Sequence, residues 1–250
     1  GAGAAALACL GLLVKLGIPR ENIWVTDIVG LVYAGRTELM DEDKAQFAQA
    51  TEQRTLAEAI EGADVFLGLS AGGVLKQDMV RKMAATPLVF ALANPNPEIQ
   101  PEDVKAVRSD AIIATGRTDY PNQVNNVLCF PYIFRGALDC GATKITEEMK
   151  LACVRQIADL AKEEMSPEVA AAYVGKELRF GPDYLIPTPF DSRLILRIAP
   201  AVAQAAADSG VATRPIQDME AYRDSLSRFV YHTSMFMRPV FATAKANLKR

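Results

Sequence analysis

The first six residues of the chain have the composition and spacing of a phosphate-binding turn. Gly1, Gly3 and Ala6 match the pattern Gly-x-Gly-x-x-small, in which the first glycine permits a tight turn and the second lets the backbone approach a pyrophosphate. The Ala- and Leu-rich residues 4–16 favour a helix, whose first N–H groups would face the phosphate. Four residues are therefore expected to bind a dinucleotide: Gly1, Ala2, Gly3 and Ala4.

A carboxylate follows this turn at the distance that a dinucleotide-binding fold requires. Residues 23–26 are predicted to form the next strand, and Asp27 ends it about 20 residues after the glycines, where such folds bind the ribose. The strand that enters the turn would have to precede Gly1. We therefore expect the sheet to lack its first strand here, and the chain to be part of a longer protein.

Three apolar runs predict buried parallel strands, each followed by a polar loop: residues 65–69, 88–92 and 111–115. Ser70 follows the first run, Asn94 the second and Gly116 the third. The carboxyl ends of parallel strands share one edge of a sheet, and ligands bind at that edge. We expect Ser70 to contact a ribose or phosphate group of the cofactor there.

Predicted helices separate these strands, over residues 55–60, 76–83 and 101–106. The alternation predicts an α/β fold with a doubly wound, Rossmann-like parallel sheet. From Pro131 onward helices predominate. Two long ones are predicted over residues 147–165 and 193–209, the second interrupted near Pro200.

The last part of the chain differs in character from residues 1–212, which we expect to form the dinucleotide-binding domain with its C-terminal helices. Residues 213–250 carry apolar side chains that a solitary domain rarely exposes: Phe229, Tyr231, Met235, Phe236 and Met237. We expect this segment to be a helical linker toward a further domain and to help form a homo-oligomer. The alternative is that these side chains fold back onto the same domain.

Composition excludes several classes of function. The net charge is −3 without a basic block, which argues against nucleic acid, and no apolar run reaches the roughly 18 residues of a membrane span. The four cysteines are scattered, which favours free buried thiols in a cytoplasmic protein over disulfides or a zinc site: Cys9, Cys129, Cys140 and Cys153.

Other candidate residues have plainer explanations. His232, the only histidine, lies among aromatic residues and is assigned a packing role. The acidic residues 41–43 read as a solvated face, because a hard cation needs convergent oxygens. Ser70 lacks both the Gly-x-Ser-x-Gly pattern and a histidine placed to activate it.

Several stretches together resemble the cofactor-binding domain of malic enzymes: residues 1–5, 25–27, 91–95 and 116–131. The most specific is the pair Asn125-Asn126 followed by Phe130-Pro131. Many members have Gly-Gln-Gly-Asn-Asn where residues 122–126 read Asn-Gln-Val-Asn-Asn. This departure, together with residues 185–191, resembles the bacterial hybrid form, in which a phosphotransacetylase-like domain follows.

The resemblance implies oxidative decarboxylation of (S)-malate to pyruvate and CO2, with NADP reduced and Mg2+ or Mn2+ bound. The family's acid/base and metal-binding residues precede the glycine-rich turn. We therefore assign no catalytic and no metal-binding residue to this chain, and expect it to be inactive by itself. Fold alone does not fix the substrate, so two alternatives stay open: another NAD(P)-dependent hydroxyacid or amino-acid dehydrogenase, and a non-catalytic regulatory domain.

Two malate-binding positions carry over from the resemblance, Asn94 and Asn126. An amide NH2 can donate to a substrate carboxylate without adding a charge. From spacing alone, Asn94 could instead form an Asx turn before Pro95, and Asn126 could cap a helix.

The choice of cofactor depends on Asp27 and Lys44. A carboxylate at position 27 ordinarily favours NAD, since it repels a 2′-phosphate. In NADP-using members that the chain resembles, a lysine precedes a Phe-Ala pair, as Lys44 precedes Phe47-Ala48 here. An ammonium group there can pair with the 2′-phosphate. We expect NADP, with NAD as the alternative if Lys44 is simply an exposed lysine on an acidic helix.

Overall fold

The computed structural model describes residues 1–164 and 179–230 of the chain. The chain divides into two compact units, which are described separately. The sheet unit comprises Gly1–Val124 and Gly181–Leu185, and the helical unit comprises Asn125–Phe180 and Ile186–Arg250. The sheet unit is therefore discontinuous, because residues 181–185 return to it after a long excursion. The expected domain boundary at residue 212 stays a prediction.

A parallel three-stranded sheet forms the centre of the sheet unit, in the order β3 (Val65–Gly68), β4 (Leu88–Ala91) and β5 (Ile112–Thr115). Gly68, Ala91 and Thr115 lie side by side at its carboxyl end. All three strands were expected from their unbroken apolar runs, which suit strands covered on both faces. The α/β class with a parallel sheet is thus confirmed.

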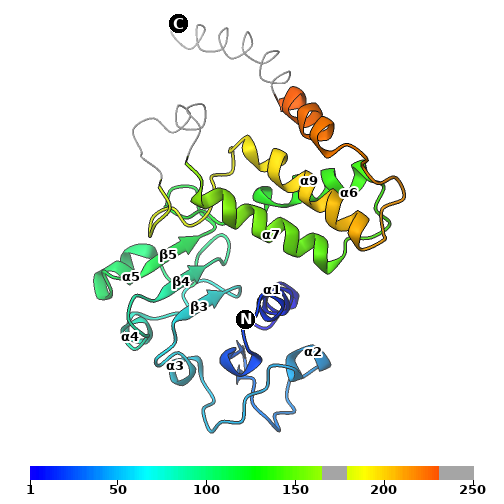
Figure 1. Cartoon of the computed structure of the whole chain (residues 1–250). Helices are drawn as coiled ribbons and strands as arrows, with labels where there is room; N and C mark the ends of the chain where they lie inside the picture. Colours follow the sequence, from blue (N-terminus) through cyan, green and yellow to red (C-terminus); the bar gives the residue numbers. More distant parts are fainter. Residues whose placement is uncertain (165–178, 231–250) are drawn as a thin grey trace, which may run out of the picture. The chain divides into compact units, whose positions relative to one another are not determined.

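Two short helices, α4 (Gln77–Arg81) and α5 (Pro101–Val107), connect these strands, and α3 (Leu56–Ala59) precedes β3 (Figure 1). Thr55 and Glu58 form a capping box that starts α3, and Pro101 occupies the first turn of α5. The core between helices and sheet consists of buried apolar side chains, among them Phe66, Val80, Val89 and Val104. This packing fixes the strand ends from which the loops that carry Ser70 and Asn94 emerge.

The N-terminal part of the sheet unit begins with α1 (Ala4–Lys15), which ends just before Gly17 at a φ of +105°. A short 3-10 turn, η1 (Arg20–Asn22), follows. The prediction that residues 23–26 form a strand of the parallel sheet is wrong. Only β1 (Thr26–Asp27) is paired, antiparallel with β2 (Gly30–Leu31).

The segment nevertheless has the burial pattern of a strand, since Ile23 and Val25 are buried while Trp24 is 41% exposed. In a doubly wound sheet, the strand that enters the glycine-rich turn separates this segment from the other strands. The described residues contain no such strand. Residues 23–25 therefore lie extended without a parallel neighbour.

Among the described residues of the helical unit, the core is built mainly by α6 (Phe130–Asp139), α7 (Glu147–Lys162) and α9 (Arg193–Asp208) (Figure 1). Buried side chains from all three meet there, including Ile133, Met149 and Ile198. α6 approaches α9 closely at Gly136, where an added Cβ would overlap the carbonyl oxygen of Ala199 and lie 3.0 Å from Cβ of Val202. The η2 turn (Asn126–Leu128) leads into α6.

The expected interruption of the last helix near Pro200 is wrong, because α9 continues through that residue. Proline removes one backbone hydrogen bond and crowds the preceding turn. Here it lies on a buried face with Ile198, Ala199, Val202 and Ala203. Packing along this face outweighs the local preference of one residue.

The cysteines and the C-terminal segment differ partly from expectation. All four cysteines are free, but Cys9 is exposed rather than buried, and Cys129 and Cys153 bring their Sγ atoms to 3.3 Å. In the segment after residue 212, Leu226 is fully buried and the Tyr222 hydroxyl donates to Asp139 of α6 at 2.7 Å. The described part of this segment therefore packs on the helical unit.

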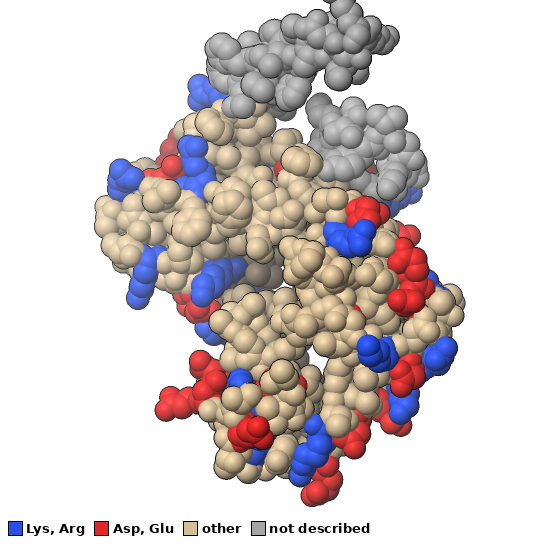
Figure 2. All heavy atoms as spheres, turned by 180° about the vertical axis from the view of Figure 1, so that it is seen from behind, with Lys and Arg blue, Asp and Glu red and all other residues tan. Residues whose placement is uncertain are grey.

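The surface agrees with the charge composition. Figure 2 shows basic and acidic side chains scattered and mixed on one face, without a continuous basic patch there. Within the described ranges, no helix is long and apolar enough to span a bilayer. Tyr231, His232, Met235, Phe236, Met237 and Met165 lie outside the described residues.

Candidate functional site

The glycine-rich turn has the geometry of an anion cradle. Gly1 lies so close to the end of β3 that a Cβ would be 2.7 Å from the carbonyl oxygen of Leu69 and 3.1 Å from Cβ of Ser70. Gly3 is the N-cap of α1 and has open space around it. The first turn of α1 carries no side-chain cap and no acidic residue. Its first N–H groups therefore remain available to an anion.

Asp27 lies at the end of β1 in a buried ion-pair cluster with Arg36 and Lys44. Nη2 of Arg36 is 2.6 Å from Oδ2 of Asp27, and Nζ of Lys44 is 3.3 Å from the same oxygen. The side chains of Asp27, Arg36 and Lys44 are only 10%, 2% and 13% exposed. Two cations thus face one carboxylate, so the cluster carries a net positive charge.

This environment alters the ionisation of Asp27. Burial alone would raise the pKa of the carboxyl group, but hydrogen bonds from Arg36, the Val29 N–H and Lys44 outweigh it and lower the pKa. Asp27 is therefore ionised throughout the neutral range.

Lys44 is held in place rather than solvated, unlike the exposed lysine of the alternative interpretation. Besides Asp27, its ammonium group donates to the Leu39 carbonyl at 2.6 Å. It belongs to α2 (Glu42–Ala45), which Asp41 caps by accepting from the Lys44 N–H. The neighbouring carboxylates of residues 41–43 are exposed, as expected, and lie outside the cluster.

The loop after β3 places Ser70 beside the glycine-rich turn. Its backbone N–H donates to Oε1 of Glu98 at 2.8 Å, and its hydroxyl donates to the same oxygen at 3.3 Å. The other oxygen of Glu98 accepts from the Ala93 N–H at 3.0 Å, next to Asn94. Glu98 was not singled out by the sequence, since nothing in its spacing marks contacts with residues 28 positions away.

Asn94 is exposed in the loop after β4, and its amide has no hydrogen-bond partner among the described residues. An Asx turn, the alternative from spacing, is not formed. The side chain is therefore uncommitted within the part of the chain that the structure covers.

Asn126 belongs to the helical unit and is also exposed, at the first position of η2. The cap of that turn is its neighbour Asn125, whose side chain accepts from the Val127 N–H at 3.0 Å. The capping role considered for Asn126 thus falls to Asn125. Like Asn94, the Asn126 amide has no partner in the described ranges.

A separate residue, Asn122, fastens the returning segment to the sheet unit. Its amide donates to the carbonyl oxygens of Ile113 and Pro182 at 2.9 and 2.7 Å and accepts from the Leu185 N–H at 2.7 Å. Its φ of 54° lies in the left-handed region that asparagine tolerates. Sequence spacing gave no sign of these contacts.

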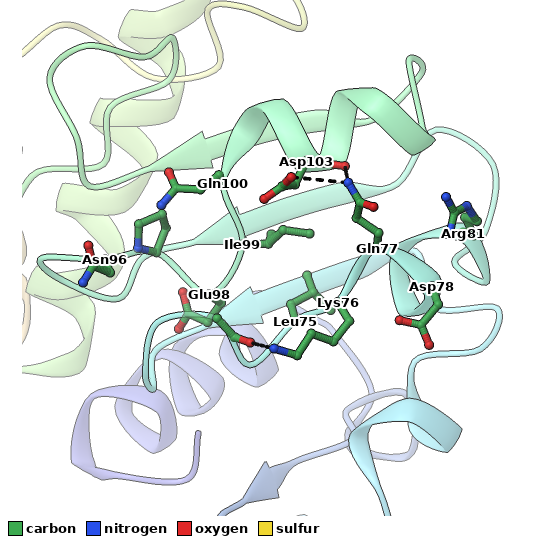
Figure 3. A pocket seen from close by; sticks show the side chains of 12 residues that line it. Leu75, Lys76, Gln77, Asp78, Arg81, Asn96, Glu98, Ile99, Gln100 and Asp103 are labelled. Carbon is green, nitrogen blue, oxygen red and sulfur yellow. Dashed lines mark hydrogen bonds between the residues drawn. The ribbon is translucent and has the colours of Figure 1, made fainter.

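A hollow of about 610 Å³ lies between α4, α5 and the segments that precede these two helices (Figure 3). Polar and charged side chains line it, including Lys76, Asp78, Arg81 and Asp103. The glycine-rich turn, Asp27 and Asn94 are not among its lining residues. None of the predicted cofactor-binding residues lines this hollow.

A metal site is not apparent in the described part of the chain, where no three His, Cys, Asp or Glu side chains converge. The cluster of Asp27 contains a single carboxylate opposed by two cations, which is unsuited to a divalent metal.

Comparison with known proteins gives one family. The family model described as "Malic enzyme, NAD binding domain" matches residues 1–172. An "NAD-dependent malic enzyme" of Rhizobium meliloti (strain 1021) is 68% identical over 245 residues, 98% of this chain and 32% of the relative. An "NADP-dependent malic enzyme" of Escherichia coli (strain K12) is 61% identical over 251 residues, 100% of this chain and 33% of the relative.

Solved structures show the same likeness. The malic enzyme of Entamoeba histolytica superposes with a TM-score of 0.82 at 31% identity, covering 96% of this chain and 49% of that one. The malic enzyme of Pyrococcus horikoshii Ot3 superposes with a TM-score of 0.79 at 32% identity, covering 96% and 54%. The chain spans about a third of the length of the curated relatives it matches.

Proposed function

Because the chain belongs to the family of malic enzyme NAD-binding domains, we propose that it is the cofactor- and substrate-binding part of an enzyme that converts (S)-malate to pyruvate and CO2 with reduction of NADP. The observation that carries the proposal is that one family match, over residues 1–172, includes the glycine-rich turn, Asp27, Asn94 and Asn126 together.

The residues of the sheet unit fit a dinucleotide. The pyrophosphate is proposed to lie on the N–H groups at the start of α1, where Gly1 and Gly3 leave room for it. Ser70, next to Gly1, faces the same region and is proposed to contact a ribose or phosphate group. The nicotinamide, when bound, would accept the hydride from C2 of malate.

NADP is favoured over NAD by the charge around Asp27. A bare carboxylate would repel a 2′-phosphate, but Arg36 and Lys44 reverse the sign of the local charge. One relative is named NAD-dependent and another NADP-dependent, so their names do not decide between the two cofactors. The preference for NADP therefore rests on the charge around Asp27.

The substrate is proposed to be held by Asn94 and Asn126, whose amides are exposed and uncommitted within the described chain. Each can donate its NH2 group to a carboxylate of malate and so orient C2 toward the nicotinamide. Neither amide carries a proton to or from the substrate. We propose that the acid/base groups and the Mg2+ or Mn2+ ligands come from residues outside this chain, since in the family that the chain resembles these residues precede the glycine-rich turn.

The full-length protein is proposed to be a cytoplasmic homo-oligomer that carries a phosphotransacetylase-like domain. The chain matches only about a third of the length of its curated relatives, so the remaining two thirds can contain further domains. The oligomer and the linked domain rest on the resemblance to the hybrid form and are tested by sizing and light scattering of the full-length protein.

The test of function is turnover by the full-length protein with malate, NADP and Mg2+ or Mn2+, followed through NADPH absorbance and pyruvate formation. We expect stoichiometric NADPH and pyruvate, and no turnover by the 250-residue chain alone. Preference for another hydroxyacid or for an amino acid would show a different dehydrogenase, and cofactor binding without any turnover would show a regulatory domain.

A further inference from the structure

We propose that Glu98 is a positioning residue whose buried carboxylate holds the loops after β3 and β4 in the arrangement that binds cofactor and malate. The inference rests on the function proposed above, but it concerns a residue that does not itself touch either ligand. Glu98 is fully buried, so it acts through the backbone that it binds.

The two carboxylate oxygens bind two different loops. Oε1 accepts from the Ser70 N–H at 2.8 Å and from its hydroxyl at 3.3 Å. Oε2 accepts from the Ala93 N–H at 3.0 Å, one residue before Asn94. A single side chain thus joins the end of β3 to the end of β4, where parallel strands bind ligands.

The connection extends to the glycine-rich turn. Gly1 packs so closely on Leu69 and Ser70 that a Cβ would come within 2.7 Å of the Leu69 carbonyl oxygen. A displacement of Ser70 would therefore move the residues against which the glycine-rich turn packs. Glu98 consequently sets the positions of three ligand-binding segments.

The Glu98 carboxylate occupies the space that a side chain at position 68 would fill. A Cβ at Gly68 would lie 2.6 and 2.7 Å from the two carboxylate oxygens of Glu98. Close approach of that kind is possible only for glycine at position 68. No Lys or Arg side chain in the described ranges pairs with Glu98, so N–H and hydroxyl donors stabilise its charge.

The charge and the position of Glu98 have opposite effects on cofactor binding. A buried negative charge near an anionic cofactor weakens binding by repulsion, so its removal alone would tighten binding. Loss of positioning would loosen both loops and weaken binding. Glu98→Gln keeps the size of the side chain but turns one acceptor into an NH2 donor, which cannot accept from an N–H.

The experiment uses the full-length protein with three variants: Glu98→Gln, Gly68→Ala and the control Glu61→Gln. Glu61 is an exposed carboxylate beyond α3. Gly68→Ala keeps the charge of Glu98 but displaces it. The Kd for NADPH is measured by its fluorescence, KM for malate by turnover, and folding by circular dichroism and thermal unfolding.

We expect Glu98→Gln and Gly68→Ala each to raise the NADPH Kd and the malate KM about tenfold while the folded fraction at the assay temperature stays near that of wild type. Glu61→Gln should match wild type. Unchanged or tighter NADPH binding in a folded Glu98→Gln variant would overturn the proposal. If one variant does not fold, the other decides, and if neither folds the role is structural and the proposal fails. Wild-type protein that binds NADPH but does not convert malate would refute the proposed function, while the Kd comparison would still test Glu98.

Discussion

Nη2 of Arg36 lies 2.6 Å from Oδ2 of Asp27, and both side chains are almost completely removed from solvent. Arg36 also donates to the carbonyl oxygens of Gly30, Leu31 and Glu38. The guanidinium group thus closes the β1–β2 hairpin and neutralises the carboxylate at the predicted ribose position. One side chain couples local stability to the charge that a cofactor would meet.

Arg36→Leu is therefore expected to destabilise the protein by about 3 kcal/mol, because Asp27 would remain buried without its main cation. The measurement is urea unfolding of the full-length protein followed by tryptophan fluorescence, since Trp24 lies near this hairpin in sequence. Arg81→Leu, at an exposed position, should change stability by less than about 0.5 kcal/mol. Equal effects of the two substitutions would contradict the role of the cluster.

The lowered pKa of Asp27 gives this contribution a defined pH dependence. A carboxyl group whose folded pKa lies below its unfolded value of about 3.9 stabilises the fold above that value. The contribution is lost as the pH falls through the folded pKa. The stability difference between wild type and Asp27→Asn should therefore be largest near neutral pH and shrink below about pH 4. A difference that is independent of pH would show that charge is not its source.

Lys44→Gln should raise KM for NADP about tenfold and leave KM for NAD within about twofold of wild type. The substitution removes one of the two cations that oppose Asp27, so a 2′-phosphate would meet a weaker positive charge. Lys82→Gln, at an exposed position outside the cluster, serves as the matched control. Equal shifts for both cofactors would identify Lys44 as a structural partner of Asp27 only.

Asn94→Ala and Asn126→Ala should each raise KM for malate about tenfold, with cofactor Kd nearly unchanged. Each substitution removes one NH2 donor, and it leaves no buried hydrogen-bond partner unpaired, because both amides are exposed. The exposed Asn22→Ala substitution is the control, because it also removes a surface amide. Wild-type malate kinetics in either variant would remove that residue from the substrate site.

Gly136→Ala should destabilise the helical unit by about 1–3 kcal/mol, since its Cβ would collide with the Ala199 carbonyl of α9. Gly11→Ala, within α1, has open space around the added methyl group and should be neutral or stabilising by up to about 1 kcal/mol. The comparison is made by thermal unfolding of the full-length protein. A stable Gly136→Ala variant would mean that α6 and α9 can separate without cost.

The sequence predicted the elements whose signals are local. Continuous apolar runs identified β3, β4 and β5, and the amphipathic pattern of residues 55–60 identified α3. Predictions from the sequence were wrong for segments whose structure depends on contacts with residues far away in the chain. Residues 23–25 have strand-like burial but no partner strand among the described residues, and Pro200 is tolerated because its helix face is buried.

The site shows the same division. The glycine pattern located the turn at the start of α1, and strand ends located Ser70 and Asn94. Arg36 and Glu98 carry no spacing signal, because their partners come from the hairpin fold and from a neighbouring strand end. Contacts of this kind arise only once the chain has folded.

Asn122 also bears on the order in which the chain folds. Its hydrogen bonds to Pro182 and Leu185 close loops of 60 and 63 residues, which contain α6 and α7. Closing a flexible loop of that length costs about 4 kcal/mol of chain entropy, which is more than these two long-range hydrogen bonds return at about 1 kcal/mol each. Residues 181–185 should therefore reach β5 late on the folding pathway, after the helical unit has shortened the path between the two ends. The sheet unit is therefore completed by residues 181–185 only after the helices that separate them from Asn122 in the sequence have formed.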